Sequence, residues 1–310
     1  MKIYRPLFWD QIKLISALLY PLSLITLLIN IIKKTKVKRS FKIKSICVGN
    51  LYVGGTGKTP LSIKINNILK KNYKTVFIKK KYSNQMDEQN ILKTYGDLIC
   101  KQSRDNALKI ATNKKYDVAI LDDGLQDKSI NYDIAIACFN SSDGIGNGFL
   151  IPSGPLRESI YEIKNYDAIV LNGEKSNKKF SKYLKKINKN IKVFEGKYIP
   201  TNLALFNLKK NFLFFCGLGN PLEFERTLKK YKFKIKEKFI FPDHYNYTSS
   251  DIYSIKKLAK QKKLNIITTE KDYLRLNKKN RKNVKFLKID LKIKNLQNFS
   301  KFLIERLWKN

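Results

Sequence analysis

A glycine-rich segment that ends in Gly-Lys-Thr is the part of this chain best suited to chemistry. Its residues are Val53, Gly54, Gly55, Thr56, Gly57, Lys58 and Thr59. Glycines let successive backbone N–H groups surround a polyphosphate, and the N-terminus of a following helix adds a positive dipole. In such a loop Lys58 reaches the β- and γ-phosphates, and the Thr59 hydroxyl ligates Mg²⁺. The segment therefore predicts a phosphate-binding loop for ATP or GTP, although Tyr52 replaces the usual first glycine. A glycine-rich surface turn is the alternative.

Two aspartates at the end of an apolar run supply a second element of this chemistry. Asp122 and Asp123 follow the run 118–121 and precede Gly124. In phosphate-binding-loop enzymes, a carboxylate at the end of a neighbouring strand holds Mg²⁺ directly or through water. We therefore predict that Thr59 and this aspartate pair form a magnesium site, with Gln126 in a supporting role. A capped Asp-Gly turn would give the same pattern.

Polar residues at three other points are further candidates. Arg157 and Glu158 close a Pro/Gly-rich loop, and an arginine fork suits a phosphate or a developing negative charge. The only histidine, His244, follows Asp243 in a predicted loop, where a structural role is an equal alternative. Glu270 lies at a predicted strand end, which is where open α/β sheets bind ligands.

Strand-like and helix-like segments alternate from residue 45 onward, which predicts a mainly parallel sheet covered on both faces. The first set comprises strands 45–49, 75–78, 118–122, 133–138, 167–171 and 191–194 and helices 60–71, 105–114 and 177–188. The second set comprises strands 212–216, 233–238, 266–269 and 284–289 and helices 222–231, 249–262 and 296–308.

The predicted fold is α/β. It has a P-loop NTPase-like domain over 45–196, a linker over 197–210 and a smaller C-terminal α/β domain over 211–310. A membrane-anchoring helix with a basic flank occupies 1–44.

Composition limits the choice of partners. The formal charge of +38 suggests nucleic acid, because a basic surface is the footprint of phosphate binding. Only eight of the 63 basic residues are arginine, however, and the lysines are spread along the chain. We therefore predict no nucleic-acid partner but attraction to an anionic membrane surface, and we expect a monomer. Four cysteines outside metal-ligand spacing and a single histidine exclude a histidine-based zinc site and fit a reducing cytoplasm.

The N-terminal run 12–32 is apolar apart from one charge near its start. About 20 such residues span a bilayer core as a helix, and the basic run 33–39 places the rest of the chain in the cytoplasm. Pro21, Lys13 and Asn30 leave open a kinked helix that lies in one leaflet. A core helix of a soluble domain is the third possibility.

The motifs occur in a characteristic order. They are Val-Gly-Asn-Leu at 48–51, Val-Gly-Gly-Thr-Gly-Lys-Thr-Pro at 53–60, Asp-Asp-Gly-Leu-Gln at 122–126, Gly-Asn-Gly at 146–148, Pro-Ser-Gly-Pro-Leu-Arg-Glu at 152–158, Pro-Asp-His-Tyr at 242–245 and Thr-Glu-Lys-Asp at 269–272. In this order they resemble the tetraacyldisaccharide 4'-kinases of lipid A biosynthesis. The resemblance spans nearly the whole chain, and the N-terminal apolar helix also fits it.

The resemblance implies a Gram-negative inner-membrane enzyme with its catalytic domains on the cytoplasmic side. Such an enzyme transfers the γ-phosphoryl group of ATP to the 4'-hydroxyl of a tetraacyldisaccharide 1-phosphate in the bilayer, giving the lipid A precursor lipid IVA. It also implies that Asp87 and His244 together activate the sugar hydroxyl. By the logic of phosphoryl transfer, we expect Lys58 and Arg157 to act on the phosphates. The family's Ser-Arg-Gly-Tyr-Gly is Lys-Lys-Lys-Tyr-Ser at 79–83, and Met86 replaces a glycine, so Asp97 is the alternative base.

Two other functions remain open. A membrane-recruited P-loop ATPase or GTPase switch would transfer phosphate only to water and would not need His244. The Thr-Glu-Lys-Asp segment superficially resembles a guanine-specificity motif, so this reading includes GTP. A basic nucleic-acid-binding protein would instead show steeply salt-dependent binding to DNA or RNA.

Overall fold

The computed structural model describes residues 6–35, 37–82, 86–243 and 245–308. The chain forms two compact units. Of the described residues, those within 6–81, Leu92–Tyr198 and 291–308 form the larger unit, and those within Tyr82–Ile91 and Ile199–Asp290 form the smaller unit. Each unit is described by itself.

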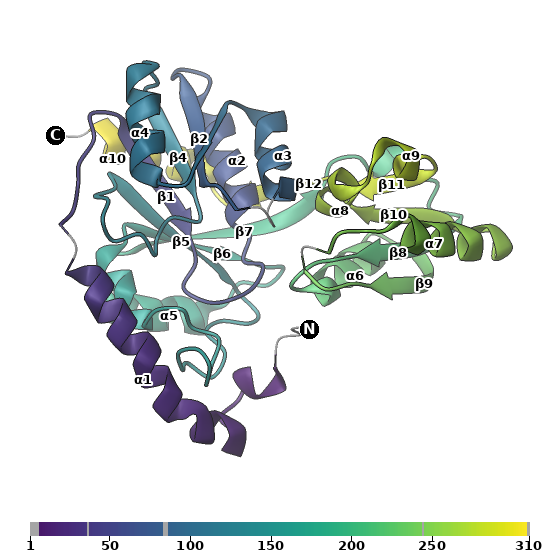
Figure 1. Cartoon of the computed structure of the whole chain (residues 1–310), viewed down its shortest axis with the longest axis horizontal. Coiled ribbons are helices and arrows are strands. Elements are labelled where there is room, and N and C mark those ends of the chain that lie inside the picture. Colours follow the sequence, from purple (N-terminus) through teal and green to yellow (C-terminus); the bar gives the residue numbers. More distant parts are fainter. Residues whose placement is uncertain (1–5, 36, 83–85, 244, 309–310) are drawn as a thin grey trace. The chain divides into compact units, whose positions relative to one another are not determined.

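The larger unit is built on an eight-stranded sheet with the order β12-β7-β6-β5-β1-β4-β2-β3 (Figure 1). The strands are β1 (Lys44–Gly49), β2 (Thr75–Lys80), β3 (Leu98–Lys101), β4 (Val118–Asp122), β5 (Ile134–Asn140), β6 (Ala168–Asn172), β7 (Lys192–Pro200) and β12 (Ile289–Ile293). Every neighbouring pair from β7 to β3 is parallel. The central strands β1, β4, β5 and β6 are buried on both faces, which explains their continuous apolar sequences.

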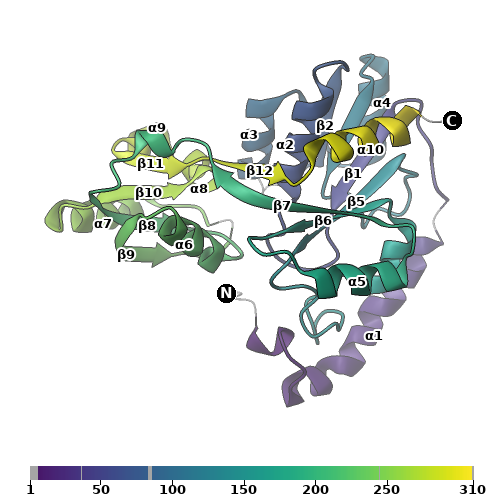
Figure 2. The same ribbon diagram turned by 180° about the vertical axis from the view of Figure 1, so that it is seen from behind.

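Helices cover both faces of this sheet. They are α1 (Leu14–Lys34), α2 (Lys58–Leu69), α4 (Arg104–Asn113), α5 (Lys178–Ile187) and α10 (Leu296–Trp308), with short 3₁₀ turns η1 (Leu7–Trp9) and η3 (Ile160–Asn165). Helices α4 and α5 lie on one face, where their apolar residues share a core cluster, and α2 and α10 lie on the other face (Figures 1 and 2). Phe194 of β7 packs against Phe299 and Phe302 of α10, so the C-terminal helix completes the larger unit's core.

The smaller unit has a four-stranded parallel sheet with the order β11-β10-β8-β9. Its strands are β8 (Asn211–Cys216), β9 (Lys234–Ile240), β10 (Asn265–Thr269) and β11 (Val284–Leu287). Its helices are α6 (Pro221–Lys230), α7 (Ser249–Gln261), α8 (Glu270–Arg275) and α9 (Lys278–Arg281), with the turn η4 (Leu203–Leu205). Along β8, Phe212 and Phe214 face one apolar cluster and Leu213 and Phe215 face another, as the alternation of a strand requires. Helix α3 (Met86–Tyr95) begins in this unit and ends in the larger one.

The predicted α/β fold with a mainly parallel sheet is confirmed, but the chain divides differently from the predicted boundaries. β7 continues to Pro200, into the segment predicted as a linker, and α10 belongs to the larger unit. The pattern also missed α3 and β3, and the predicted strand 284–289 is divided between β11 and β12. A chain that leaves a unit and later returns to it carries no local sequence signal of the return.

Candidate active site

The glycine-rich segment follows β1 and leads into α2, as the phosphate-binding loop requires. Gly57 has φ of +87° and stands at the N-terminal end of α2, so the chain turns there through a left-handed conformation that favours glycine. A Cβ on Gly57 would lie 1.9 Å from the Tyr198 hydroxyl oxygen. Gly54 also has positive φ, of +133°. The loop backbone is therefore held at the helix N-terminus, where anions bind.

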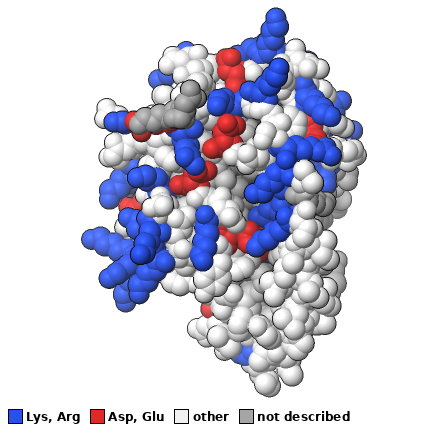
Figure 3. All heavy atoms as spheres, turned by 90° about the vertical axis from the view of Figure 1, so that its left-hand side faces the viewer, with Lys and Arg blue, Asp and Glu red and all other residues white. Residues whose placement is uncertain are grey.

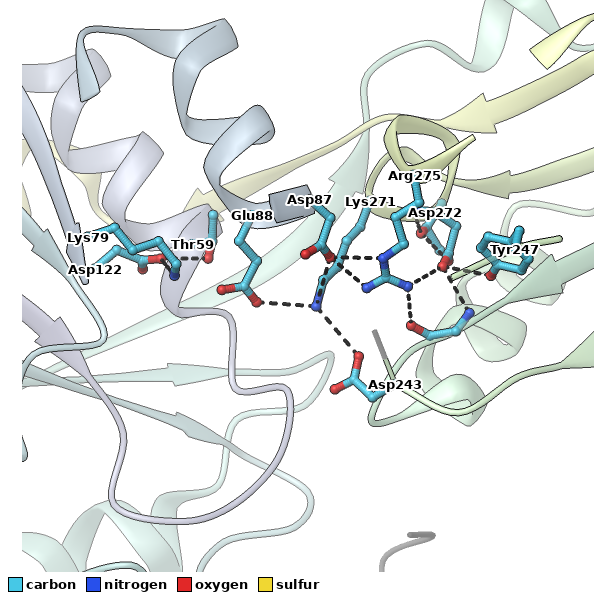
Figure 4. A network of polar contacts seen from close by, with 12 residues as sticks. Thr59, Lys79, Asp87, Glu88, Asp122, Asp243, Tyr247, Lys271, Asp272 and Arg275 are labelled. Carbon is cyan, nitrogen blue, oxygen red and sulfur yellow. Dashed lines mark hydrogen bonds and ion pairs between the residues drawn. The ribbon is translucent and has the colours of Figure 1, made fainter. Parts of the chain in front are cut away.

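Asp122 lies beside the start of α2, because parallel pairing sets Val48 of β1 opposite Asp122 of β4. Its Oδ2 accepts a hydrogen bond of 3.0 Å from Thr59 Oγ1, and its Oδ1 accepts one of 3.0 Å from Ser62 Oγ. Lys79 Nζ lies 2.7 Å from the same Oδ2, as Figure 4 shows. Asp122 and Lys79 are each 1% exposed, so their charges must pair. Sequence reasoning noted Lys79 only as a departure from the family pattern.

Asp123 lies close to two side chains that are predicted to act in catalysis, Lys58 and Arg157. Its backbone has φ of +62°, which directs the chain away from β4. Its Oδ1 lies 3.8 Å from Lys58 Nζ and 3.3 Å from Arg157 Nη2. Arg157 also donates a hydrogen bond to Asn50 Oδ1. The structure thus brings together three predicted site residues, Lys58, Asp123 and Arg157.

Gln126 and Asn50 hold the backbone between β1 and the glycine-rich loop. Gln126 Nε2 donates to the Asn50 carbonyl at 2.7 Å, and Asn50 Nδ2 donates to the Tyr52 carbonyl at 2.7 Å. Val53 N donates to the Pro155 carbonyl at 2.9 Å. Gln126 therefore contacts the backbone just before the loop, and its supporting role stays a prediction.

The loop is also held from β6, by a residue that sequence reasoning missed. Asn172 Nδ2 donates to the Thr56 carbonyl at 2.6 Å. Asn172 Oδ1, Thr56 Oγ1 and Arg157 Nε are buried and have no hydrogen-bond partner within the described part of the chain. Buried polar groups are normally paired, so these three leave hydrogen-bonding capacity for a ligand.

Glu158 lies apart from the phosphate-binding loop, in an ion-pair network. It is 2% exposed, lies 3.0 Å from Lys128 Nζ and accepts a hydrogen bond from Tyr166. Lys128 also pairs with Glu162, which pairs with Lys34 at the end of α1. Burial raises the pKa of Glu162, but hydrogen bonds and charge from Lys34 and Lys128 outweigh it and lower the pKa overall.

Asp87 belongs to a second cluster, within the smaller unit. It lies in the first turn of α3 and is 4% exposed. Arg275 donates to Asp87 Oδ2 from Nε at 3.0 Å and from Nη2 at 2.6 Å. Lys271 Nζ lies 3.6 Å from Asp87, 3.2 Å from Glu88 and 3.5 Å from Asp243 (Figure 4). Burial lowers the pKa of Lys271, but these three carboxylates outweigh it and raise the pKa overall.

Arg275 is itself anchored by Asp272, which sequence reasoning also missed as a site residue. Asp272 Oδ1 accepts bonds from Arg275 Nη1 at 2.8 Å, from Tyr247 at 2.8 Å and from Gly217 N at 3.0 Å. Thr269 Oγ1 donates to the other oxygen at 2.6 Å. The Thr-Glu-Lys-Asp motif and the arginine three residues beyond it therefore form one polar support under Asp87.

Three other predicted residues have different outcomes. His244 lies outside the described residues. Asp97 immediately precedes β3 and accepts a bond from Tyr116, which precedes β4, so it lies toward the amino ends of the strands. The glycine-rich loop follows the carboxyl end of β1, and the structure therefore does not bring Asp97 to it. Glu270 begins α8 beside Lys271, and burial raises its pKa.

The side chains next to the loop that could contact a divalent cation are few. In the described ranges, no group of three or more His, Cys, Asp or Glu side chains could hold a metal ion. Thr59, Asp122 and Asp123 supply only oxygen donors next to the loop, and oxygen donors suit Mg²⁺, which commonly shares its coordination with substrate phosphates.

One described helix is long and apolar enough to cross a membrane. It is α1, whose most apolar window has a mean hydropathy of 2.1 and is only 11% buried. By themselves, length and composition are weak evidence of membrane association.

Similar proteins were found by three comparisons. A family model described as tetraacyldisaccharide-1-P 4'-kinase matches residues 15–308. A tetraacyldisaccharide 4'-kinase from Pelagibacter ubique is 46% identical over 100% of both chains, and one from Rickettsia canadensis is 35% identical over 95% of each. The crystal structure of "apo" form LpxK from Aquifex aeolicus in complex with ATP has a TM-score of 0.73 at 22% identity, covering 95% of this chain and 100% of that one. That structural likeness shows a common fold.

Proposed function

This chain belongs to the tetraacyldisaccharide-1-P 4'-kinase family, and we propose that it transfers the γ-phosphoryl group of ATP to the 4'-hydroxyl of a tetraacyldisaccharide 1-phosphate. The product is lipid IVA, a precursor of lipid A. The observation that carries this proposal is the meeting of Lys58, Asp123 and Arg157 beside a glycine loop at a helix N-terminus. Phosphoryl transfer needs such positioned positive charge more than it needs covalent chemistry.

The phosphates would be held by the loop 53–59. Backbone N–H groups of Gly54, Gly55 and Gly57 and the ammonium group of Lys58 bind the β- and γ-phosphates. Arg157 neutralises charge on the transferring group, with Asn50 and Asp123 orienting its guanidinium. The unpartnered Arg157 Nε and Thr56 Oγ1 support this role, because an incoming phosphate would satisfy them.

A magnesium ion would be held by Thr59 and the two aspartates together with phosphate oxygens. When bound, it would supply positive charge that offsets the charge of the phosphates. Asp122 holds the Thr59 hydroxyl in place, while Lys79 and Ser62 keep the carboxylate in one orientation. Asp123 supplies a second carboxylate on the side of Arg157.

The sugar proton would be accepted by Asp87, acting with His244. Arg275 and Lys271 fix the position of the Asp87 carboxylate, which a general base must keep within reach of the proton that it accepts. As the proton leaves the 4'-hydroxyl, its oxygen attacks the γ-phosphorus and the ADP oxygen departs.

The enzyme would lie on the cytoplasmic face of the inner membrane, with α1 along one leaflet. Most exposed side chains of α1 are Leu and Ile, whereas its buried ones are Ser16, Ser23 and Asn30. Contacts from Ser16 to Asn30 tie about 21 Å of helix to the larger unit, which supports a helix that lies along one leaflet. In Figure 3 the lower surface, at the level of α1 in Figure 1, is almost free of charge, and Lys and Arg gather above it. Acyl chains of the substrate would lie beside this helix, and Lys33 and Lys34 would meet anionic headgroups. We propose a monomer.

The testing experiment is transfer of label from [γ-³²P]ATP to tetraacyldisaccharide 1-phosphate in detergent micelles. Wild type is compared with Lys58→Ala, Asp87→Ala and His244→Ala, and with Lys70→Ala as an exposed-lysine control. Labelled lipid that disappears with Lys58→Ala, falls strongly in the other two variants and persists in the control is the expected result. Full activity of Asp87→Ala would exclude it as the base.

The same assay separates the alternative functions. Label released only as free phosphate, with or without the lipid, would favour a nucleotide switch. Equal transfer from GTP and ATP would show that the enzyme does not distinguish guanine from adenine. Faster transfer from GTP would support the guanine-specific interpretation of the Thr-Glu-Lys-Asp segment.

A further inference from the structure

The polar residues of α1 form a stripe that does not face the lipid. Ser16, Ser23 and Asn30 are spaced seven residues apart, which is close to two helical turns, so they share one face. They are at most 9% exposed, while neighbours such as Leu18, Ile25 and Ile32 are more than half exposed. Buried polar groups on an apolar helix are costly unless they are paired, so the stripe must have partners.

The partners of Ser23 and Asn30 belong to the segment 147–157, here called the arginine loop because it ends at Arg157, whereas Ser16 Oγ donates to the Lys13 carbonyl within the first turn. Ser23 Oγ donates to the Leu150 carbonyl at 2.8 Å, and Asn30 Nδ2 donates to the Arg157 carbonyl at 2.9 Å. Thr26 Oγ1 donates to the Ile151 carbonyl at 2.7 Å.

Further bonds join the arginine loop to the N-terminal part of α1 and to the turn before it. Ser153 Oγ donates to the Ser16 carbonyl, and Trp9 Nε1 donates to the Pro152 carbonyl at 2.9 Å. The arginine loop is therefore held along its length by η1 and α1.

The other side of the arginine loop is bonded to the phosphate-binding segment. Arg157 N donates to the Leu51 carbonyl at 2.7 Å, and Val53 N donates to the Pro155 carbonyl at 2.9 Å. The Arg157 side chain continues to Asp123. A continuous set of hydrogen bonds thus runs from the apolar helix, through the arginine loop, to the residues that handle phosphate.

We propose that α1 is a positioning element of the active site as well as an anchor. Seating of α1 in the bilayer fixes the arginine loop, and Asn30 is the positioning residue that holds the backbone of Arg157. Membrane contact and catalytic competence are coupled through this one helix. The inference rests on the proposed function, because it takes Arg157 as the group that acts on the transferring phosphate.

The test separates anchoring from positioning. Asn30→Leu removes the donor to Arg157 and leaves α1 more apolar, so binding to phosphatidylglycerol-containing vesicles should not weaken. We expect unchanged vesicle binding and ATP KM, a kcat for the lipid that falls about 10–100-fold, and recovery in Asn30→Gln. Thr26→Val, which is nearly isosteric, should give a smaller loss of kcat. Ile29→Ala, on the exposed face, is the comparison variant: it should weaken vesicle binding and raise the KM for the lipid, and its kcat at saturating lipid should fall much less than that of Asn30→Leu.

Hydrogen exchange gives a readout that does not depend on activity. Amides of the arginine loop, above all that of Arg157, should exchange faster in Asn30→Leu than in wild type or in Ile29→Ala. The inference would be overturned if Asn30→Leu kept the wild-type kcat and the wild-type amide exchange rates while Arg157→Ala was inactive. The proposed kinase function would stand in that case. Failure of wild type to label the lipid would overturn the proposed function, and the exchange result would still decide whether α1 holds the loop.

Discussion

The ammonium nitrogen of Lys79 lies 2.7 Å from Oδ2 of Asp122, and both side chains are buried. The same oxygen accepts the hydroxyl of Thr59, so the ion pair touches the start of α2. A buried ion pair adds little net stability, but removal of one partner leaves a charge with neither water nor a counter-charge. Lys79 therefore compensates the charge of the buried Asp122 carboxylate next to the phosphate-binding loop.

The first prediction concerns this pair. Lys79→Met should lower the free energy of unfolding by about 3–5 kcal/mol, because Asp122 is left buried without its cation. The measurement is urea unfolding in detergent, with exposed Lys81→Met as the control. Adding Asp122→Asn to Lys79→Met should recover part of the loss. Equal stability of Lys79→Met and wild type would show that the buried pair is absent in solution.

The second prediction concerns the backbone of the phosphate-binding loop. Gly57→Ala should cost about 2–4 kcal/mol, because its φ of +87° is strained for alanine and the new methyl group would meet the Tyr198 hydroxyl. Thermal unfolding without nucleotide measures the cost. Gly55→Ala is the control, since no atom lies within 4 Å of its added Cβ. Tyr198→Phe should relieve part of the Gly57→Ala defect, and absence of such relief would contradict the steric cause.

The third prediction concerns the support under Asp87. Arg275→Met should lower kcat about 10–100-fold, because Asp87 loses the two donors that orient it. Arg275→Lys should recover only part, since lysine keeps the charge but lacks the planar fork. Steady-state lipid kinetics measures both, beside exposed Arg226→Met as the control. An Arg275→Met enzyme with wild-type kcat would separate this cluster from catalysis.

The fourth prediction concerns acid stability. The pKa of Glu162 is lowered from its usual 4.5, so its ion pairs with Lys34 and Lys128 stabilise the fold above pH 4.5. That contribution is lost as the pH falls through the lower folded-state pKa. The difference in unfolding free energy between wild type and Glu162→Gln should be constant near neutral pH and shrink below about pH 4.5. Glu305→Gln, at a more exposed pair, should show a much smaller difference. A difference in unfolding free energy between wild type and Glu162→Gln that grows as the pH falls would contradict this prediction.

The sequence predicted most strands and helices of the fold, because the residue patterns that indicate them are local. Runs such as 118–122 are apolar throughout, as buried parallel strands must be, and Gly57 with Lys58 marks the start of α2. It also predicted that Lys58, Asp123 and Arg157 serve one site, although 99 positions separate the first from the last.

What the sequence could not reveal depends on distant pairing. Lys79 was visible only as a departure from a family pattern, because its partner Asp122 lies on a neighbouring strand. Arg275 looked like an ordinary helix residue until Asp87 was found against it. Ser16, Ser23 and Asn30 are spaced regularly, but the sequence could not say that a loop more than a hundred residues away would bind them.

The return of the chain to the larger unit has a consequence for how the protein is made. Ile199–Asp290 is synthesised before Leu291–Asn310, which supplies most of β12 and all of α10. At roughly 5–20 residues per second, the ribosome leaves the core around Phe194 without its covering helix for several seconds. The apolar helix α1 is synthesised before α10, so it leaves the ribosome while that core is still open. Nascent chains stalled before residue 291 should therefore be protease-sensitive and should associate with chaperones.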